Sequence, residues 1–171
     1  MKLSTRSLTI TGLLGAITII LGATGLGLIP VPTPAGRATI LHVPTIIAGI
    51  LEGPVVGTFV GLIFGLYSFT TAPSALAKDP FVSILPRLLI GVVAYYVYKL
   101  GGKNVYLSSV LAAIAGTLTN TVGFLGMAVL RGYLNWHAAG GIAVVHGIPE
   151  IIVATVFVVV LVKALQKRYA H

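Results

Sequence analysis

Apolar residues fill the chain in six long runs, separated by short polar or proline-rich breaks. We predict helices over approximately residues 8–28, 38–51, 55–69, 81–99, 105–130 and 143–165. A run of about 20 apolar residues matches the hydrocarbon thickness of a bilayer. The run over 38–51 is short for a full span and contains Pro44, so we expect it to be kinked or partly re-entrant.

The breaks between the runs carry turn signals and no linker. Residues 29–37, "IPVPTPAGR", form a proline-rich stretch that no helix would cross. Residues 52–54, "EGP", predict a tight turn between the second and third runs. No internal repeat interrupts this pattern. We therefore predict an all-α polytopic membrane protein with six transmembrane helices, forming a single domain over residues 1–171.

Composition supports a membrane protein over a soluble one. Hydrophobic residues make up 57% of the chain and charged residues only 8%, against about 25% charged residues in a typical soluble domain. The formal net charge is +8, but the basic residues are scattered singly around the apolar runs. Membrane topology and lipid headgroups explain such scattered cations, so we expect no nucleic-acid partner. The chain has no cysteine, which excludes disulfides and thiolate metal sites.

The distribution of lysine and arginine predicts the orientation. An even number of spans places both termini on one side of the membrane. Because basic residues are enriched on the cytoplasmic side of membrane proteins, we expect both termini to be cytoplasmic. The basic residues on that side are Lys2, Arg6, Lys99, Lys103, Lys163, Lys167 and Arg168. The outer side still carries Arg37, Lys78, Arg87 and Arg131, either as tolerated loop cations or as cations that face an anionic solute.

Several polar residues lie inside the apolar runs. His146 and Glu150 are four residues apart, so they share one face of the last helix, and Asn120 lies in the helix before it. Acidic residues in membrane helices are rare and usually functional. Glu150 either lines a solute cavity, with Arg87 or His146 as its partner, or ties helices together. Asn120 is equally open to an interhelical contact or a ligand contact.

Small residues give information on helix packing, and the remaining polar residues form no recognisable chemical motif. Gly57, Gly61 and Gly65 recur every four residues, which predicts close internal helix packing. A weaker pair of small residues, Gly12 and Ala16, lies on the first helix. No metal-ligand signature, nucleotide-binding loop or catalytic triad is present in the sequence. We therefore expect no metal site, no cofactor and no enzymatic activity.

Four blocks of sequence together point to a known family. They are "HVPTIIAGILEGPVVGTFVGLIFGLYSF", "DPFVSILPRLLIGVVAY", "AGTLTNTVGFLGM" and "GIPEIIVATV". In this order they resemble the substrate-binding S components of energy-coupling factor (ECF) vitamin transporters, in the subgroup for riboflavin, pantothenate and hydroxymethylpyrimidine. The resemblance implies a high-affinity subunit in the cell membrane of a prokaryote. It also implies partnership with a transmembrane T component and two ATPases that consume the ATP.

The resemblance also implies functional residues. In the family, small residues of the first helix contact the T component; Gly12 and Ala16 fit that position, with glycine replacing the usual first alanine. The family's pocket opens outward and is built from outer loops and the later helices. Carried over to this chain, it implies a substrate site made of Arg37, His42, Arg87, Asn120, His146 and Glu150, with Tyr133 and Trp136 as lid or stacking groups.

The substrate is inferred from the residue types available. A flavin needs several aromatic stacking faces. The chain has seven Tyr, six Phe and one Trp, and few of them fall in the half of the protein that we expect to face outward. The basic outer side favours an anion, so pantothenate is the leading hypothesis. Riboflavin and hydroxymethylpyrimidine stay open. Alternatives of other classes are a solitary small-solute channel, an integral-membrane enzyme and a structural membrane subunit.

Overall fold

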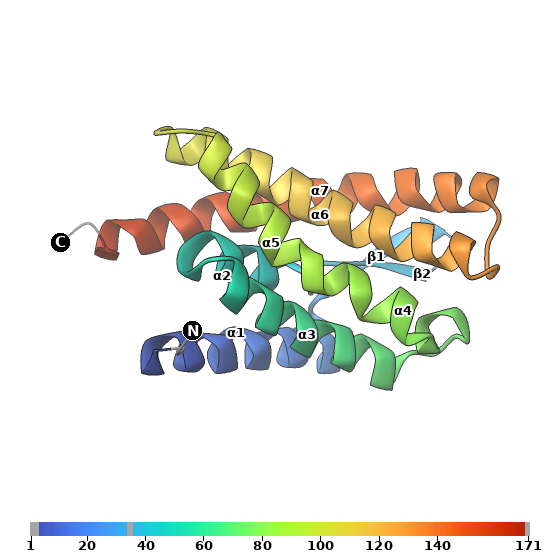
Figure 1. The fold of residues 1–171 in the computed structure, drawn as a ribbon. Coiled ribbons are helices and arrows are strands. Elements are labelled where there is room, and N and C mark those ends of the chain that lie inside the picture. The colour runs from blue at the N-terminus through green and yellow to red at the C-terminus, as the bar shows by residue number, and fades with distance from the viewer. Residues whose placement is uncertain (1–3, 34–35, 170–171) are drawn as a thin grey trace.

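The chain folds into a bundle of helices with one short β-hairpin (Figure 1). The computed structural model describes residues 4–33 and 36–169. The elements are α1 (Thr5–Ala23), β1 (Leu28–Thr33), β2 (Gly36–Thr39), α2 (Val43–Glu52), α3 (Pro54–Thr71), the 3-10 helix η1 (Leu76–Lys78), α4 (Pro80–Ser83), α5 (Leu85–Leu100), α6 (Val105–Leu130) and α7 (Trp136–Tyr169). The predicted all-α class is confirmed, with the hairpin as an addition.

The six predicted runs all contain helix, but they are not six equal spans. Five helical segments within the described residues are long and apolar enough to cross a membrane: α1, α3, α4 with α5, α6, and α7. Helix α2 has ten residues and is therefore about 15 Å long, half of a hydrocarbon core of about 30 Å. The expectation of a short second segment is confirmed. The count of six full spans is not.

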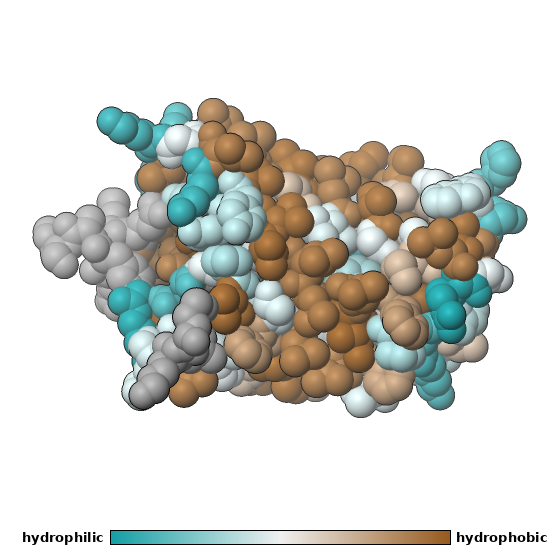
Figure 2. Space-filling model, viewed as in Figure 1, coloured by the Kyte–Doolittle hydropathy of each residue, from teal (hydrophilic) through white to brown (hydrophobic). Residues whose placement is uncertain are grey.

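The surface and the course of the chain fit a membrane-embedded bundle. On the face seen in Figure 2, a broad apolar band separates hydrophilic residues at the two ends of the molecule. Figure 1 places the start of α1 and the end of α7 at the same end of the bundle, as an orientation with both termini on one side requires. Which of the two ends faces the cytoplasm stays a prediction from the basic residues.

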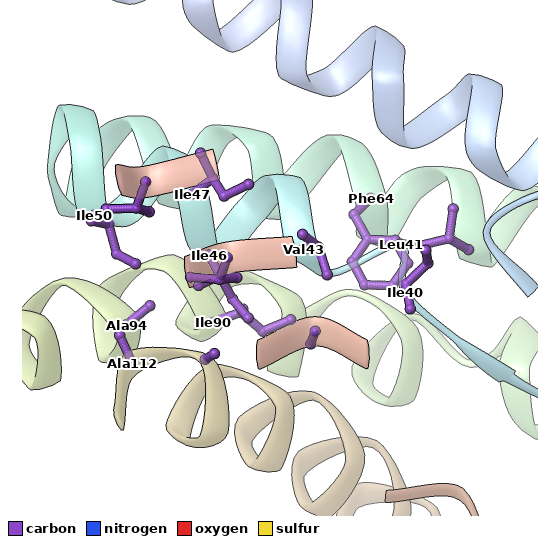
Figure 3. Close-up of a cluster of buried hydrophobic side chains, with 14 residues drawn as sticks. Ile40, Leu41, Val43, Ile46, Ile47, Ile50, Phe64, Ile90, Ala94 and Ala112 are labelled. Atoms are coloured by element: carbon purple, nitrogen blue, oxygen red, sulfur yellow. The ribbon is translucent and has the colours of Figure 1, made fainter. Parts of the chain in front are cut away.

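Helix α2 lies at the centre of the bundle. Eight of its ten residues are buried, and it contacts α1, α3, α5, α6 and α7. Ile46 of α2 meets Ile90 of α5 in the main apolar core, beside Ala112 of α6 (Figure 3). The helix ends at Gly53, whose φ of 96° belongs to the region that favours glycine. The chain then enters α3 directly, as the predicted tight turn requires.

The proline-rich break forms the hairpin. Strands β1 and β2 pair antiparallel, with Leu28 opposite Thr39 and Ile29 opposite Ala38. No helix crosses this stretch, as predicted, but the strands themselves were not predicted. Prolines are normally excluded from sheet interiors because they donate no backbone hydrogen bond. A two-stranded hairpin tolerates Pro30 and Pro32 because each of its strands has a free edge.

The glycine series of α3 packs against α5, as predicted. A Cβ atom added at Gly57 would lie 2.8 Å from the Cα atom of Gly91, and one at Gly61 would collide with the backbone carbonyl of Arg87. A Cβ atom at Gly65 would lie 3.0 Å from the Cα atom of Ile84. Because the neighbouring atoms belong to the backbone, they cannot rotate away. The close approach fixes the position of α5 and therefore of Arg87.

Candidate functional site

A cavity of about 800 Å³ lies among α3, α5, α6, α7 and the hairpin. It extends to the connection between α3 and α4, at the end of the bundle opposite the start of α1. Apolar and aromatic side chains such as Phe64, Tyr67 and Phe124 make up much of its wall. Four of the predicted site residues also line it: Arg87, Asn120, His146 and Glu150. Four polar residues that were singled out in the sequence, from three helices, therefore surround one cavity.

Glu150 joins three elements at the cavity wall. Its Oε1 atom accepts the backbone N–H of Thr39 at 2.7 Å, and its Oε2 atom accepts the hydroxyl of Thr121 at 2.8 Å. Only 4% of the residue is exposed. A buried carboxylate needs such donors, because removal from water is otherwise strongly unfavourable. The contacts tie α7 to the hairpin and to α6, so Glu150 has the geometry of a clamp at the edge of the cavity.

Arg87 points into the bundle and does not reach the outer interface. Its guanidinium carbon lies 5.2 Å from the ring centre of Phe64 and 4.6 Å from that of Phe124. One of its N–H groups donates to the carbonyl of Val82 at 2.8 Å. Aromatic faces attract a cation electrostatically and stabilise it away from water. The arrangement holds a cation, 6% exposed, against the cavity.

Asn120 and His146 complete the polar part of the wall. Asn120 is 4% exposed, and its Oδ1 atom has no hydrogen-bond partner among the described residues. His146 is 7% exposed and lies one turn before Glu150 on α7. A polar solute in this cavity would therefore meet a cation, an amide and an imidazole.

Three other predicted residues do not line the cavity. His42 is completely buried at the start of α2, where its Nε2 atom lies 3.0 Å from the hydroxyl of Thr117. It links α2 to α6 inside the core. Tyr133 is 42% exposed in the turn between α6 and α7, and Trp136 is 67% exposed at the start of α7.

The backbone of Arg37 lies in β2, opposite Pro30. Its side chain lies outside the described part of the structure. The prediction that Arg37 contacts the substrate therefore stays a prediction.

Several cavity residues escaped the sequence analysis. Thr39 contributes its backbone N–H, which no side-chain pattern could reveal. Membrane threonines often bond the backbone of their own helix, whereas the hydroxyl of Thr121 donates to Glu150. Phe64 and Phe124 resemble ordinary apolar residues of a membrane helix in the sequence. Only the position of Arg87 between them reveals their role.

A second polar cluster, called the rim cluster here, lies at the end of the bundle opposite the start of α1 (Figure 1). The carboxylate of Asp79 caps α4 by accepting the N–H of Phe81 at 2.9 Å. The same carboxylate accepts Nε–H of Arg131 at 2.7 Å and the hydroxyl of Tyr133 at 3.3 Å. These contacts join the α3–α4 connection to the α6–α7 turn. The hydrogen bond from Arg131 lowers the pKa of Asp79 below its usual value of 3.8, and Phe81 and Tyr133 act in the same direction.

The rim cluster predicts a defined pH dependence. A carboxylate whose pKa is lowered by folding stabilises the folded state above its unfolded pKa, and loses this effect as the pH falls through the folded pKa. We expect Asp79→Asn to lower the melting temperature by a constant amount between about pH 5 and 7, because Asp79 stays ionised there. The difference from wild type should shrink below about pH 4. Thermal unfolding of both proteins in detergent across pH 3–7 measures it, and a difference that grows on acidification would contradict the assignment.

The described residues bring together no group of three or more His, Cys, Asp or Glu side chains that could hold a metal ion. The polar groups of the cavity are instead spread over separate walls. The arrangement suits an organic solute with several polar groups.

Comparison with known proteins gives three consistent results. Residues 6–162 match the family described as ECF transporter, substrate-specific component. The pantothenic acid transporter PanT of Lactococcus lactis subsp. cremoris (strain MG1363) is 34% identical, over 77% of this chain and 79% of that protein. A solved S component of a bacterial ECF transporter covers 96% of this chain and 95% of its own, with a TM-score of 0.60 and 22% identity. That structure has the same fold.

Proposed function

Because this chain belongs to the family of substrate-specific components of ECF transporters, we propose that it captures pantothenate for import. The observation that carries the proposal is a buried arginine in a largely apolar cavity, in a chain similar to a pantothenic acid transporter. Pantothenate is a small carboxylate with hydroxyls and an amide. Arg87 supplies the cation that a carboxylate requires, and Asn120 and His146 supply hydrogen-bonding groups for the remainder.

The partners and the location follow from the same proposal. We expect the chain to lie in the cell membrane of a prokaryote and to work with a T component and two ATPases that hydrolyse ATP. Helix α1 offers a docking face, since it buries only Gly15 and Thr18. Gly12 and Ala16 are exposed on it, and a Cβ atom at Gly12 would meet nothing within 4 Å.

A vitamin panel tests the substrate. We expect pantothenate to raise the melting temperature of the purified protein, while riboflavin and hydroxymethylpyrimidine leave it unchanged. A ligand at about 100 times its Kd stabilises the folded state by about 2.7 kcal/mol, which thermal unfolding detects readily. Calorimetry then measures the affinity. A clear shift with riboflavin and none with pantothenate would overturn the proposed substrate.

An uptake experiment tests the partner. We expect Gly12→Leu and Ala16→Leu to abolish pantothenate uptake in cells that contain the T component and ATPases, while the purified variants still bind pantothenate. Gly126→Leu is the matched control, because a Cβ atom there also meets nothing within 4 Å. It should leave uptake intact. Undiminished uptake in cells without the energising subunits would instead favour a solitary transporter.

A further inference from the structure

The polar side chains of the cavity differ in how many of their hydrogen-bonding groups are already used. Glu150 has one donor on each carboxylate oxygen, from Thr39 and Thr121. Arg87 and Asn120 are as deeply buried as Glu150 but are much less satisfied. Buried polar groups in native proteins normally have partners, so an unpartnered polar side chain that also lines a cavity marks a place where a ligand can complete the hydrogen bonds.

Arg87 has most of its hydrogen-bonding capacity free. A guanidinium carries five N–H donors, and the described structure shows one of them used, by the carbonyl of Val82. The Nε atom is buried without a partner. The rings of Phe64 and Phe124 stabilise the positive charge but supply no acceptor for the remaining N–H groups. A carboxylate matches this plane, because its two oxygens accept parallel N–H groups.

Asn120 needs the opposite kind of group. Its Oδ1 atom is buried and accepts no hydrogen bond from the described residues, so it requires a donor. The neighbouring residue Thr121 cannot serve, because its hydroxyl donates to Glu150. A ligand hydroxyl or amide N–H fills this requirement.

Glu150 does not take the place of a ligand on Arg87. Arg87 and Glu150 both line the cavity, yet they form no ion pair or hydrogen bond with one another in the structure. Because both oxygens of Glu150 are held by Thr39 and Thr121, the donors of Arg87 stay available.

We propose that Arg87 and Asn120 bind the ligand directly. The ligand carboxylate binds Arg87, and a ligand hydroxyl or amide N–H donates to Asn120. Glu150 is a positioning residue that holds the cavity wall and makes no direct contact with the carboxylate. This inference rests on the proposed function. It adds that the cavity selects an anion and rejects the same molecule when its carboxylate is replaced by an alcohol.

A cycle between residue and ligand tests the assignment. Calorimetry on the purified full chain measures the affinity of wild type and Arg87→Gln for pantothenate and for pantothenol, in which an alcohol replaces the carboxylate. We expect wild type to prefer pantothenate by about 100-fold, since a buried charge loses much of its binding when its partner is removed. Arg87→Gln should lower the affinity for pantothenate by about the same factor and change the affinity for pantothenol by less than about threefold.

Two further variants make the cycle decisive. Asn120→Leu should lower the affinity for both ligands about equally, since pantothenate and pantothenol share the amide and the hydroxyls. Thr119→Val is the matched control next to it, because the hydroxyl of Thr119 bonds the backbone of its own helix at Ala115. It should bind as wild type does.

The outcomes separate the inference from the function it rests on. If wild type does not bind pantothenate, the proposed function and the assignment of Arg87 and Asn120 as the ligand contacts both fail. If wild type binds pantothenate and pantothenol equally, or if Arg87→Gln weakens both ligands alike, the function stands and the carboxylate assignment is overturned. Should Arg87→Gln fail to fold, the preference of wild type between the two ligands still tests whether the cavity selects an anion.

Discussion

Gly57→Leu is expected to yield no folded protein that can be purified, with a loss of more than about 4 kcal/mol in the free energy of unfolding. A Cβ atom at Gly57 would approach the Cα atoms of Gly91 and Gly49 to 2.8 and 3.0 Å, so the first added carbon already meets backbone on two sides. Most overpacked cores relax by rotating side chains. Backbone atoms of neighbouring helices cannot do so, and α3 would have to move away from both α2 and α5.

The measurement is the monodisperse fraction after detergent extraction, followed by thermal unfolding. Gly126→Leu, on α6, controls for the loss of a membrane-helix glycine, because its Cβ atom would meet nothing within 4 Å. We expect that variant to behave as wild type. A Gly57→Leu protein with the melting temperature of wild type would mean that α3 and α5 do not approach as closely as described.

Glu150→Gln is expected to destabilise the protein even with no solute present. An amide accepts hydrogen bonds at its oxygen only. With that oxygen on the N–H of Thr39, the amide NH2 must donate to the hydroxyl of Thr121, and both charge-assisted hydrogen bonds are lost. Hydrogen bonds to charged groups contribute about 1.5–3 kcal/mol in soluble proteins, and single side-chain contacts between membrane helices average about 0.6 kcal/mol. We therefore expect a loss of about 1–3 kcal/mol in the free energy of unfolding. The affinity for pantothenate should fall less than it does in Arg87→Gln.

A double-mutant cycle identifies the source of this loss. Thr121→Val removes one of the two donors, so Glu150→Gln should lower the free energy of unfolding by less in a Thr121→Val background than in wild type. Thr119→Val, next but one along α6, should not couple to Glu150 because its hydroxyl bonds its own helix. Unchanged stability of Glu150→Gln combined with lost affinity would instead make Glu150 a direct ligand contact.

The sequence predicted the helices well where length and periodicity were sufficient. The boundaries of α6 agree with the prediction, and the glycine series of α3 packs inward as expected. The last helix begins at Trp136, earlier than predicted, because small residues such as Gly140 and Gly141 were read as a loop. The β-hairpin was missed because its pairing depends on hydrogen bonds between segments whose prolines argue against strands.

The candidate site was predictable by residue type and less so by position. Arg87, Asn120, His146 and Glu150 stood out because polar groups in apolar runs require a reason, and the structure gathers all four at one cavity. His42 met the same criterion but lies inside the core, where its Nε2 atom is within hydrogen-bonding distance of the Thr117 hydroxyl. Residue type alone cannot separate these cases, because the difference lies in which neighbouring helix faces the side chain.

Helix α2 has a consequence for biosynthesis. A segment of ten residues is too short to be held in the bilayer as an independent span, although it is almost entirely apolar. Only Gly53 separates it from α3, so the insertion machinery must receive the two as one continuous stretch. We expect α2 to move into the protein interior only after α3 and α5 have been synthesised. The residues at the centre of the finished bundle are therefore translated early, but their contacts with α5, α6 and α7 form only after most of the chain has been made.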